Sequence, residues 1–311
     1  MAPGACPVSE VDGALLRTVL FAPANHQRRV ERLGDFDADA VVLDLEDAVA
    51  NAEKVPARDA IPSALARYAG PLRCVRVNGL ATGLLFGDLN AVTGPNLDMV
   101  VVPKIESSAE LGFVDAHLER LEAERGLEPG AIRLLPIVET ARGILRMEDI
   151  AASAGERVMT FLFGTGDYTV DLGIEPTPGA EELVYPRTRL VLCCRAYGFA
   201  PPVDGPFFTD LEDEEAFVAD SRRSRSLGFH GRLVLHPRQV AWANRAYSIL
   251  EPEELRTVEE VVEAFEAAER EGLASIRVGS RFVDYPIYQL ARRRLDRYRA
   301  YRRDEKGGRD G

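Results

Sequence analysis

The chain has 311 residues, of which 46% are apolar and 28% charged, and this composition excludes a disordered or fibrous protein. Its 38 basic and 50 acidic residues leave a net charge of −12, which argues against a nucleic-acid partner and requires locally placed cations for any anionic ligand. No apolar run approaches the roughly 18 residues that span a bilayer, and the N-terminal MAPGACPVSEVDG lacks the basic and apolar regions of a signal peptide.

The cysteines indicate a reducing compartment. Cys6, Cys74, Cys193 and Cys194 contain no CxxC pair, and the adjacent Cys193 and Cys194 cannot easily bridge each other. Nothing in their spacing resembles a disulfide framework or a zinc site. We therefore expect a cytoplasmic protein with no membrane partner.

Short β-branched runs alternate with amphipathic stretches along the chain. Such runs are nearly continuous in apolar residues, which is typical of strands buried on both faces of a parallel sheet. The predicted strands cover residues 17–22, 40–45, 73–77, 98–103, 133–138, 158–163, about 202–207, and 232–235. The predicted helices cover 27–33, 56–68, a weaker segment at 83–94, 107–124, 140–154, 181–199, 213–227 and 237–250.

Eight strand–helix units predict an α/β fold, a (β/α)8 TIM barrel over residues 15–250, with an open doubly wound sheet as the alternative. A helix at 253–271, a strand-like piece and a basic helix at 286–303 follow, and together they are too small for an independent core. We expect them to form a C-terminal helical extension or lid over 251–303. The small and charged residues of 1–14 and 304–311 predict a flexible N-terminus and a disordered tail.

The carboxyl ends of the predicted strands, where a barrel of this kind carries its chemistry, are unusually polar. The polar residues at these ends are Asp44, Glu46 and Asp47 at the second strand, Arg76 at the third, Lys104 and Glu106 at the fourth, Glu139 at the fifth, Asp167 at the sixth, Asp204 in the seventh, and His236 at the eighth.

Glu139 and Asp167 are the candidate metal ligands. They end adjacent strands, which lie about 4.8 Å apart, and two ionised carboxylates at that spacing need a shared proton or a cation between them. Mg²⁺ suits two carboxylates, waters and a ligand, and Mn²⁺ is a possible substitute. The glycines beside Asp167, including Gly166, let the backbone approach a ligand closely. The alternative is a carboxylate neutralised by a nearby arginine such as Arg142.

Arg76 is the candidate anion-binding residue. It emerges between two valines, and an arginine there is costly to bury without a partner. It can pair with the acids of the second strand or hold a substrate carboxylate in its fork.

The motifs at these positions resemble those of the citrate lyase β-subunit-like proteins of the HpcH/HpaI aldolase superfamily, which includes malyl-CoA and citramalyl-CoA lyases. The resemblance covers about residues 15–300 in order. It is carried by RTVLFAPAN, VVLDLEDAV, VRVNGL, VVPKIES, PIVETARGIL, GTGDYTVDLG, LVLHPRQV and GSRFVDYP.

The resemblance implies a metal-dependent carbon–carbon lyase that cleaves or forms a 3-hydroxyacyl-CoA through a metal-chelated 2-oxo acid and a thioester enolate. The partners it implies are an acyl-CoA such as acetyl-CoA, a 2-oxo acid, and further copies of the chain in a trimer or hexamer. The residue roles it implies are metal ligation by Glu139 and Asp167, substrate contacts by Arg76, Glu139, Gly166 and Asp167, catalysis by Arg76 and by Asp284 as a lid base, and support of the metal site by Asp44, Glu46, Asp47 and Lys104.

Two departures from the family pattern stand out. The family usually has G-A-E-D before its second ligand, whereas Gly164-Thr165-Gly166-Asp167 lacks one acid, which leaves the substrate preference open. The usual V-P-G after the first strand reads Ala22-Pro23-Ala24, so the loop expected near CoA matches the family pattern less clearly. The CoA phosphates need cations, and the candidates are Arg28, Arg29 and Arg32 on the first helix.

The same motifs are compatible with other activities. One is a citrate lyase β-subunit that acts on an acyl-carrier thioester, and another is an acyl-CoA thioesterase or synthase that uses the same site. A class II aldolase of free 4-hydroxy-2-oxo acids would need a histidine base, for which His26 and His236 are candidates. A Schiff-base lyase would use Lys104, which needs a lowered pKa and instead stands beside Glu106.

Overall fold

The computed structural model describes residues 16–177, 179–207, 209–248 and 250–307, so the predicted flexible N-terminus, 1–14, and the end of the predicted tail, 308–311, lie outside the described residues. The chain divides into two compact units, of which the first ends at Tyr247 and the second begins at Ser248. Among the described helices, none is long and apolar enough to cross a membrane.

In the first unit, eight parallel strands of the described chain close into a barrel in sequential order, because β8 pairs with β1. The barrel prediction is therefore confirmed, and the open sheet is excluded. The strands are β1 (Thr18–Pro23), β2 (Ala40–Asp44), β3 (Leu72–Arg76), β4 (Met99–Val102), β5 (Arg133–Val138), β6 (Leu162–Phe163), β7 (Val203–Asp204) and β8 (Gly231–Val234).

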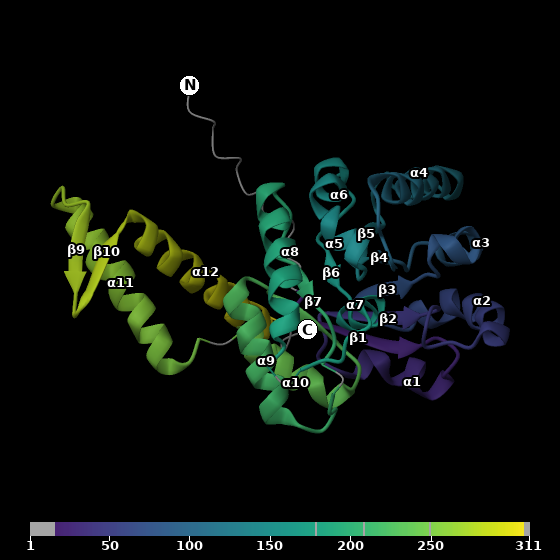
Figure 1. Cartoon of the computed structure of the whole chain (residues 1–311), viewed down its shortest axis with the longest axis horizontal. Coiled ribbons are helices and arrows are strands. Elements are labelled where there is room, and N and C mark those ends of the chain that lie inside the picture. The colour runs from purple at the N-terminus through teal and green to yellow at the C-terminus, as the bar shows by residue number, and fades with distance from the viewer. Residues whose placement is uncertain (1–15, 178, 208, 249, 308–311) are drawn as a thin grey trace. The chain divides into compact units, whose positions relative to one another are not determined.

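Helices follow the strands around the outside of the barrel, and Figure 1 shows α1 to α4 outside β1 to β4. The α-helices of this unit are α1 (Gln27–Arg32), α2 (Lys54–Leu65), α3 (Leu85–Val92), α4 (Ser108–Arg125), α5 (Ala141–Leu145), α6 (Met147–Ser153), α7 (Thr165–Leu172), α8 (Val184–Ala196), α9 (Glu214–Leu227) and α10 (Pro237–Ser248). The last residue of α10, Ser248, is counted with the second unit. Short 3₁₀ turns are η1 (Leu33–Asp35), η2 (Asn51–Glu53), η3 (Leu80–Thr82) and η4 (Glu181–Leu183).

Four elements differ clearly from the prediction, one of them the seventh strand, which keeps only Val203–Asp204 of the predicted 202–207. The helix predicted at 140–154 is broken at Arg146 into α5 and α6. The sixth strand keeps only Leu162–Phe163 of the predicted 158–163, with an isolated bridge at Val158. Helix α7, which follows it at once, was not predicted, because its eight residues carry too short an apolar pattern to be told from a loop.

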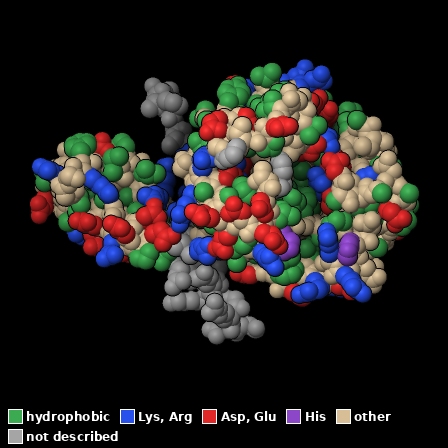
Figure 2. All heavy atoms as spheres, turned by 60° about the horizontal axis from the view of Figure 1, so that its bottom comes forward, with side chains coloured by type: hydrophobic (Ala, Val, Ile, Leu, Met, Phe, Trp, Pro, Cys, Tyr) green, Lys and Arg blue, Asp and Glu red, His purple; other side chains and the backbone are tan. Residues whose placement is uncertain are grey.

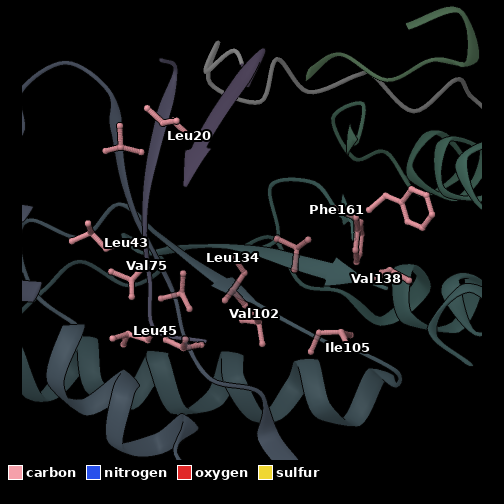
Figure 3. Close-up of a cluster of buried hydrophobic side chains, with 14 of the residues drawn as sticks. Leu20, Leu43, Leu45, Val75, Val102, Ile105, Leu134, Val138 and Phe161 are labelled. Atoms are coloured by element: carbon pink, nitrogen blue, oxygen red, sulfur yellow. The ribbon is translucent and has the colours of Figure 1, made fainter. Parts of the chain in front are cut away.

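The strands alternate between two cores. One cluster consists of inward-facing residues such as Val42 and Cys74 and contains no residue of a described helix. The other contains the alternate strand residues together with the helices that cover them. Figure 3 shows part of this outer layer, with Leu45, Val102 and Ile105 next to helix ribbons. The period of two along each strand therefore decides which side chains can reach the barrel mouth.

The second unit has its own small core, so the expectation that this segment is too small for one is wrong, because its two helices and a hairpin bury apolar side chains against one another. It contains α11 (Pro252–Arg270), the antiparallel hairpin β9 (Ser275–Val278) and β10 (Arg281–Asp284), and α12 (Tyr285–Gly307). Phe265 is fully buried there and stacks on Tyr288 at 4.7 Å between ring centroids. The predicted strand-like piece is thus a hairpin, and the last helix continues past the predicted end at 303.

Candidate active site

The inward direction of two site residues follows from strand periodicity. Ala40 and Val42 of β2 lie in the interior cluster, so Asp44, two residues further, continues the inward series at the end of the strand. In β3 the same step leads from Cys74 to Arg76. Asp44 and Arg76 are also register partners, so both side chains reach the barrel mouth side by side.

Asp44 and Arg76 form a two-pronged ion pair. Arg76 Nε and Nη2 each donate to a different oxygen of Asp44 at 2.6 Å, and Nη1 lies 2.9 Å from Glu46 Oε2. Burial alone would lower the pKa of Arg76, but the charges of Asp44 and Glu46 outweigh it and raise the pKa above its ordinary value. The guanidinium is therefore permanently charged, and its pairing with the acids of the second strand is confirmed.

Glu139 continues the inward series of β5, in which Leu135 and Ile137 belong to the interior cluster. The residue is 2% exposed, and its Oε1 accepts a hydrogen bond from the Lys104 backbone N–H at 2.9 Å. Burial, followed by the negative charges of Asp167 and Glu46, raises the pKa of Glu139 to about 8. A cation at this carboxylate would relieve all three effects.

Gly164 makes room for Glu139. A Cβ atom at Gly164 would lie 2.1 Å from Glu139 Oε2, so no other residue fits while Glu139 keeps this position. The sequence analysis singled out Gly166 as the glycine that lets a ligand approach. In the structure, the Gly166 carbonyl oxygen accepts a hydrogen bond from Thr169 Oγ1. The missing side chain that the carboxylate requires is at 164.

Asp167 lies in the first turn of α7 rather than on a strand, because β6 ends at Phe163. A helix N-terminus favours an anion at that position. Its side chain remains about one third exposed, with Oδ1 3.6 Å from Lys104 Nζ. Asp167 can therefore reach a ligand without leaving its helix.

Lys104 connects the acids of the mouth. It has φ of 53°, a left-handed conformation that is uncommon for lysine. Its Nζ lies 2.7 Å from Glu46 Oε1 and 3.1 Å from Asp47 Oδ2. Burial would lower the pKa of Lys104, but the hydrogen bond and charge of Glu46 outweigh it and raise the pKa, which opposes a role as imine-forming nucleophile.

The donor set fits Mg²⁺. Glu139 and Asp167 supply carboxylate oxygens, and no third acid, histidine or cysteine of the described chain completes a three-ligand cluster with them. Mg²⁺ tolerates this because it keeps several waters. Burial first, and then the charges of Asp167 and Glu46, raise the pKa of Glu139 even with Arg76 nearby, so a bound cation would favour its ionised form. Arg142, the predicted alternative partner, instead donates to Glu106 Oε2 at 3.2 Å.

Two polar strand-end residues do not join the site. Asp204 faces the helix layer, where it binds Arg187 and Arg232, and both of these arginines also bind Asp220. His236 Nδ1 accepts a bond from the Arg238 N–H at the start of α10.

Asp284 belongs to the second unit, where it ends β10. Its Oδ1 accepts a bond from the Ile287 N–H in the first turn of α12. The structure thus shows a helix-capping contact for this side chain, and its predicted role as a lid base stays a prediction.

Lys54 was missed by the sequence analysis. It opens α2 and is buried beside the acidic loop, where Nζ donates to the carbonyl oxygens of Leu45 and Glu46 at 2.8 and 2.6 Å. A usable signal was present, because only Lys54, Lys104 and Lys306 of the 38 basic residues are lysines.

Sequence and structure comparisons agree on one group of proteins. A profile described as HpcH/HpaI aldolase/citrate lyase matches residues 17–237. The citrate lyase subunit beta of Leuconostoc mesenteroides subsp. cremoris is 32% identical over 281 residues, covering 90% of this chain and 92% of that protein. The L-malyl-CoA/beta-methylmalyl-CoA lyase of Cereibacter sphaeroides (strain ATCC 17029 / ATH 2.4.9) is 33% identical over 293 residues, covering 86% and 90%. The structure of CitE from Mycobacterium tuberculosis in complex with magnesium, acetoacetate and coenzyme A is similar with a TM-score of 0.73 at 28% identity, covering 92% of this chain and 98% of that one.

Proposed function

This chain belongs to the HpcH/HpaI aldolase/citrate lyase family and is a metal-dependent carbon–carbon lyase, and from that premise we propose its metal and substrates. We propose that it uses Mg²⁺ to cleave, or form, a 3-hydroxyacyl-CoA such as malyl-CoA or citramalyl-CoA. The products of cleavage are acetyl-CoA, or another acyl-CoA, and a 2-oxo acid.

One observation carries the proposal: Glu139 and Asp167 both approach Lys104 at the same mouth where Arg76 is held. Glu139 and Asp167 would hold the metal, with the remaining positions left to waters and substrate. Bound Mg²⁺ would act as a Lewis acid on the carbonyl of the oxo acid. The name of the Cereibacter relative and the ligands of the CitE complex support this choice of metal and substrate class.

Arg76 supplies the fixed positive charge of the proposed reaction. Asp44 occupies two of its donor positions and orients the guanidinium, which stays charged throughout the physiological pH range. A charge held in place before the reaction stabilises negative charge that develops on the substrate oxygen. Asp44, Glu46, Asp47 and Lys104 would maintain this geometry.

In the condensing direction, Asp284 would remove a proton from the methyl group of acetyl-CoA. The resulting enolate carbon attacks the carbonyl carbon of the oxo acid, the carbonyl π electrons move to oxygen, and this oxygen takes up one proton, which balances the proton that Asp284 removed. Cleavage reverses these steps. Asp284→Asn tests this role, since asparagine keeps an oxygen for the Ile287 cap but cannot serve as a base.

CoA phosphates require a local basic surface. On the face drawn in Figure 2, acidic and basic side chains are interspersed and form no large basic field. We propose that the exposed Arg28, Arg29 and Arg32 of α1 meet the phosphates.

We further propose that the chain forms a homo-oligomer, either a trimer or a hexamer. Helix α5 packs against both α7 and α8, and these helices expose apolar side chains. Val170 is 78% exposed, Leu145 66% and Leu192 64%. Exposed apolar patches on a folded protein mark interaction surfaces. Light scattering on the purified protein gives the oligomer mass directly.

The decisive experiment measures cleavage of malyl-CoA and citramalyl-CoA with Mg²⁺ and with excess EDTA. We expect release of acyl-CoA and oxo acid only with the metal. Cleavage of an acyl-carrier thioester but not of the CoA thioester would identify a citrate lyase β-subunit, and release of free CoA would identify a thioesterase. Activity on a free 4-hydroxy-2-oxo acid without CoA would overturn the proposal.

A further inference from the structure

We propose that Lys54 is a positioning residue of this active site: its buried ammonium group fixes the backbone at Leu45 and Glu46 and thereby sets the acids that hold Arg76 and Lys104. The inference rests on the proposed function, which gives those acids their task. Lys54 itself touches neither of the candidate metal ligands in any contact described above.

The contacts of Lys54 are unusual for a buried cation. Its Nζ makes its two hydrogen bonds to neutral peptide carbonyls of consecutive residues, at 2.8 and 2.6 Å. The residue is 8% exposed and is the first residue of α2, where the helix dipole disfavours a positive charge. Burial and the dipole both oppose a lysine here, so the two carbonyl contacts must offset both effects.

The backbone that Lys54 holds is the loop that carries the acids. The Glu46 N–H donates to Asp44 Oδ1 at 2.9 Å, and the Ala48 N–H donates to Asp44 Oδ2 at 3.2 Å. The Glu46 carbonyl accepts from the Val49 N–H as well as from Lys54. A rotation of the peptide between residues 45 and 46 would therefore disturb the bonds that orient Asp44.

The side chains of this loop reach the reacting centre. Glu46 directs one oxygen to Arg76 and the other to Lys104, and Asp44 occupies two donors of Arg76. Glu46 Oε2 lacks hydrogen-bond geometry with any partner in the described chain, so its position depends on the backbone and on charge. Lys54 fixes that backbone.

Only a lysine suits this task. An ammonium group is compact and can direct two of its three N–H bonds to carbonyls of neighbouring residues from one atom. A guanidinium spreads its donors over a rigid planar fork. The chain uses arginine for all but three of its 38 basic residues, yet it has lysine at 54.

The test compares wild type with Lys54→Met, which keeps the length of the side chain and removes the charge. Three quantities are measured: the Mg²⁺ dissociation constant by calorimetry, kcat and KM at saturating Mg²⁺, and amide hydrogen exchange of residues 44–49. We expect the Mg²⁺ dissociation constant to rise about 10- to 100-fold, as for outer residues that orient metal ligands. We expect kcat to fall by a similar factor, KM for the thioester to stay within about twofold, and the 44–49 amides to exchange faster. Lys54→Arg should rescue none of these fully.

Tyr68→Phe is the matched control. Tyr68 Oη is also a buried donor to a backbone carbonyl, that of Val30 in α1, but it does not hold the acidic loop. We expect Tyr68→Phe to lower Tm and leave Mg²⁺ affinity and 44–49 exchange within about twofold. Equal losses in both variants would show that Lys54 acts only through general stability and would overturn the inference.

Two further outcomes keep the inference separate from the proposed function. If wild type binds no Mg²⁺ and cleaves no CoA thioester, the proposed function is wrong. Amide hydrogen exchange of residues 44–49 still tests whether Lys54 fixes the loop backbone. If Lys54→Met does not fold, Lys54→Gln is measured in the same way. Rapid exchange of the 44–49 amides in wild type would itself show that the loop is not held, and the inference would then be wrong.

Discussion

Asp44 and Arg76 end neighbouring strands in register, and the carboxylate accepts two hydrogen bonds of 2.6 Å from the guanidinium at the barrel mouth. Asp44 is almost fully buried, so its carboxylate has no bulk water as an alternative partner, while Arg76 keeps a small exposed fraction at the mouth. The pair therefore couples the stability of the β2–β3 wall to the orientation of the group that is proposed to meet the substrate.

Asp44→Asn tests this coupling. Removing one partner of a buried ion pair leaves the other charge uncompensated and typically costs about 3–5 kcal/mol of unfolding free energy. We expect a loss of that size in urea unfolding, together with a fall in kcat/KM. Arg120→Ala breaks the exposed Arg120–Glu124 pair and should change stability by no more than about 0.5 kcal/mol. An Asp44→Asn protein as stable as wild type would contradict the assignment.

Glu139→Gln and Asp167→Asn test the metal ligands. Each substitution removes one negatively charged donor, and we expect the Mg²⁺ dissociation constant to rise more than about 100-fold, because even residues that only orient ligands contribute 10- to 100-fold. Calorimetry measures the affinity, and turnover should fall with it. Glu148→Gln, on an exposed position of α6, is the control. Either ligand variant retaining wild-type turnover in excess EDTA would exclude the metal role.

Gly164→Ala tests the close approach of the backbone to Glu139. The added Cβ would lie 2.1 Å from Oε2, so the carboxylate must move and Mg²⁺ binding should be lost. Gly112→Ala in α4 is the matched control, because nothing lies within 4 Å of its Cβ and alanine favours a helix by about 0.5–1 kcal/mol. Thermal unfolding with and without Mg²⁺ distinguishes the two variants: Mg²⁺ should raise the Tm of Gly112→Ala and leave that of Gly164→Ala unchanged. A Gly164→Ala protein that Mg²⁺ stabilises as much as wild type would show that Glu139 has another position available.

The raised pKa of Glu139 predicts a pH dependence with a definite sign. Its pKa is 4.5 ordinarily and about 8 in the metal-free fold, so between these values the folded state binds more protons than the unfolded state. The free energy of unfolding should therefore fall as pH rises through this window, by up to about 1.4 kcal/mol per pH unit from this group. Urea unfolding at several pH values measures this slope in wild type and in Glu139→Gln, where the contribution of residue 139 is absent. The two proteins should show the same pH dependence over this window if Glu139 titrates normally.

The same shift predicts proton release on metal binding. At pH 7 most of the metal-free protein carries a proton on Glu139, and Mg²⁺ must displace it. Calorimetry in buffers of different ionisation enthalpy should report close to one proton released per Mg²⁺ at pH 7, and fewer at pH 9. A value near zero at pH 7 would contradict the shift.

Lys104 should not form an imine. Its ammonium is held by Glu46 and Asp47, which raise its pKa and keep it protonated. Borohydride added with an oxo acid should leave full activity, as measured after dialysis against a sample treated without the oxo acid. Inactivation that depends on the oxo acid, with a mass increase at Lys104, would restore the Schiff-base mechanism.

The sequence by itself determined the eight strand–helix units and the approximate position of most strands, because apolar runs of four to six residues and the period of two are local properties, whereas the closure of the barrel came from the pairing of β8 with β1. The inward position of Asp44, Arg76 and Glu139 could also have been read from that period. Short elements could not be predicted in this way. Helix α7 has eight residues and strands β6 and β7 have two each, and segments this short show no recognisable hydrophobic periodicity.

Only the tertiary structure decided which residues meet. Asp204 stands at a strand end like Asp44, yet it faces the helix layer and joins Arg187 and Arg232. Gly164 is required because a carboxylate 25 residues earlier in the chain lies against it, and Lys54 has its role because α2 brings it back to the loop after β2. Such contacts depend on how the strands are staggered when the barrel closes, and no local pattern in a sequence encodes that arrangement.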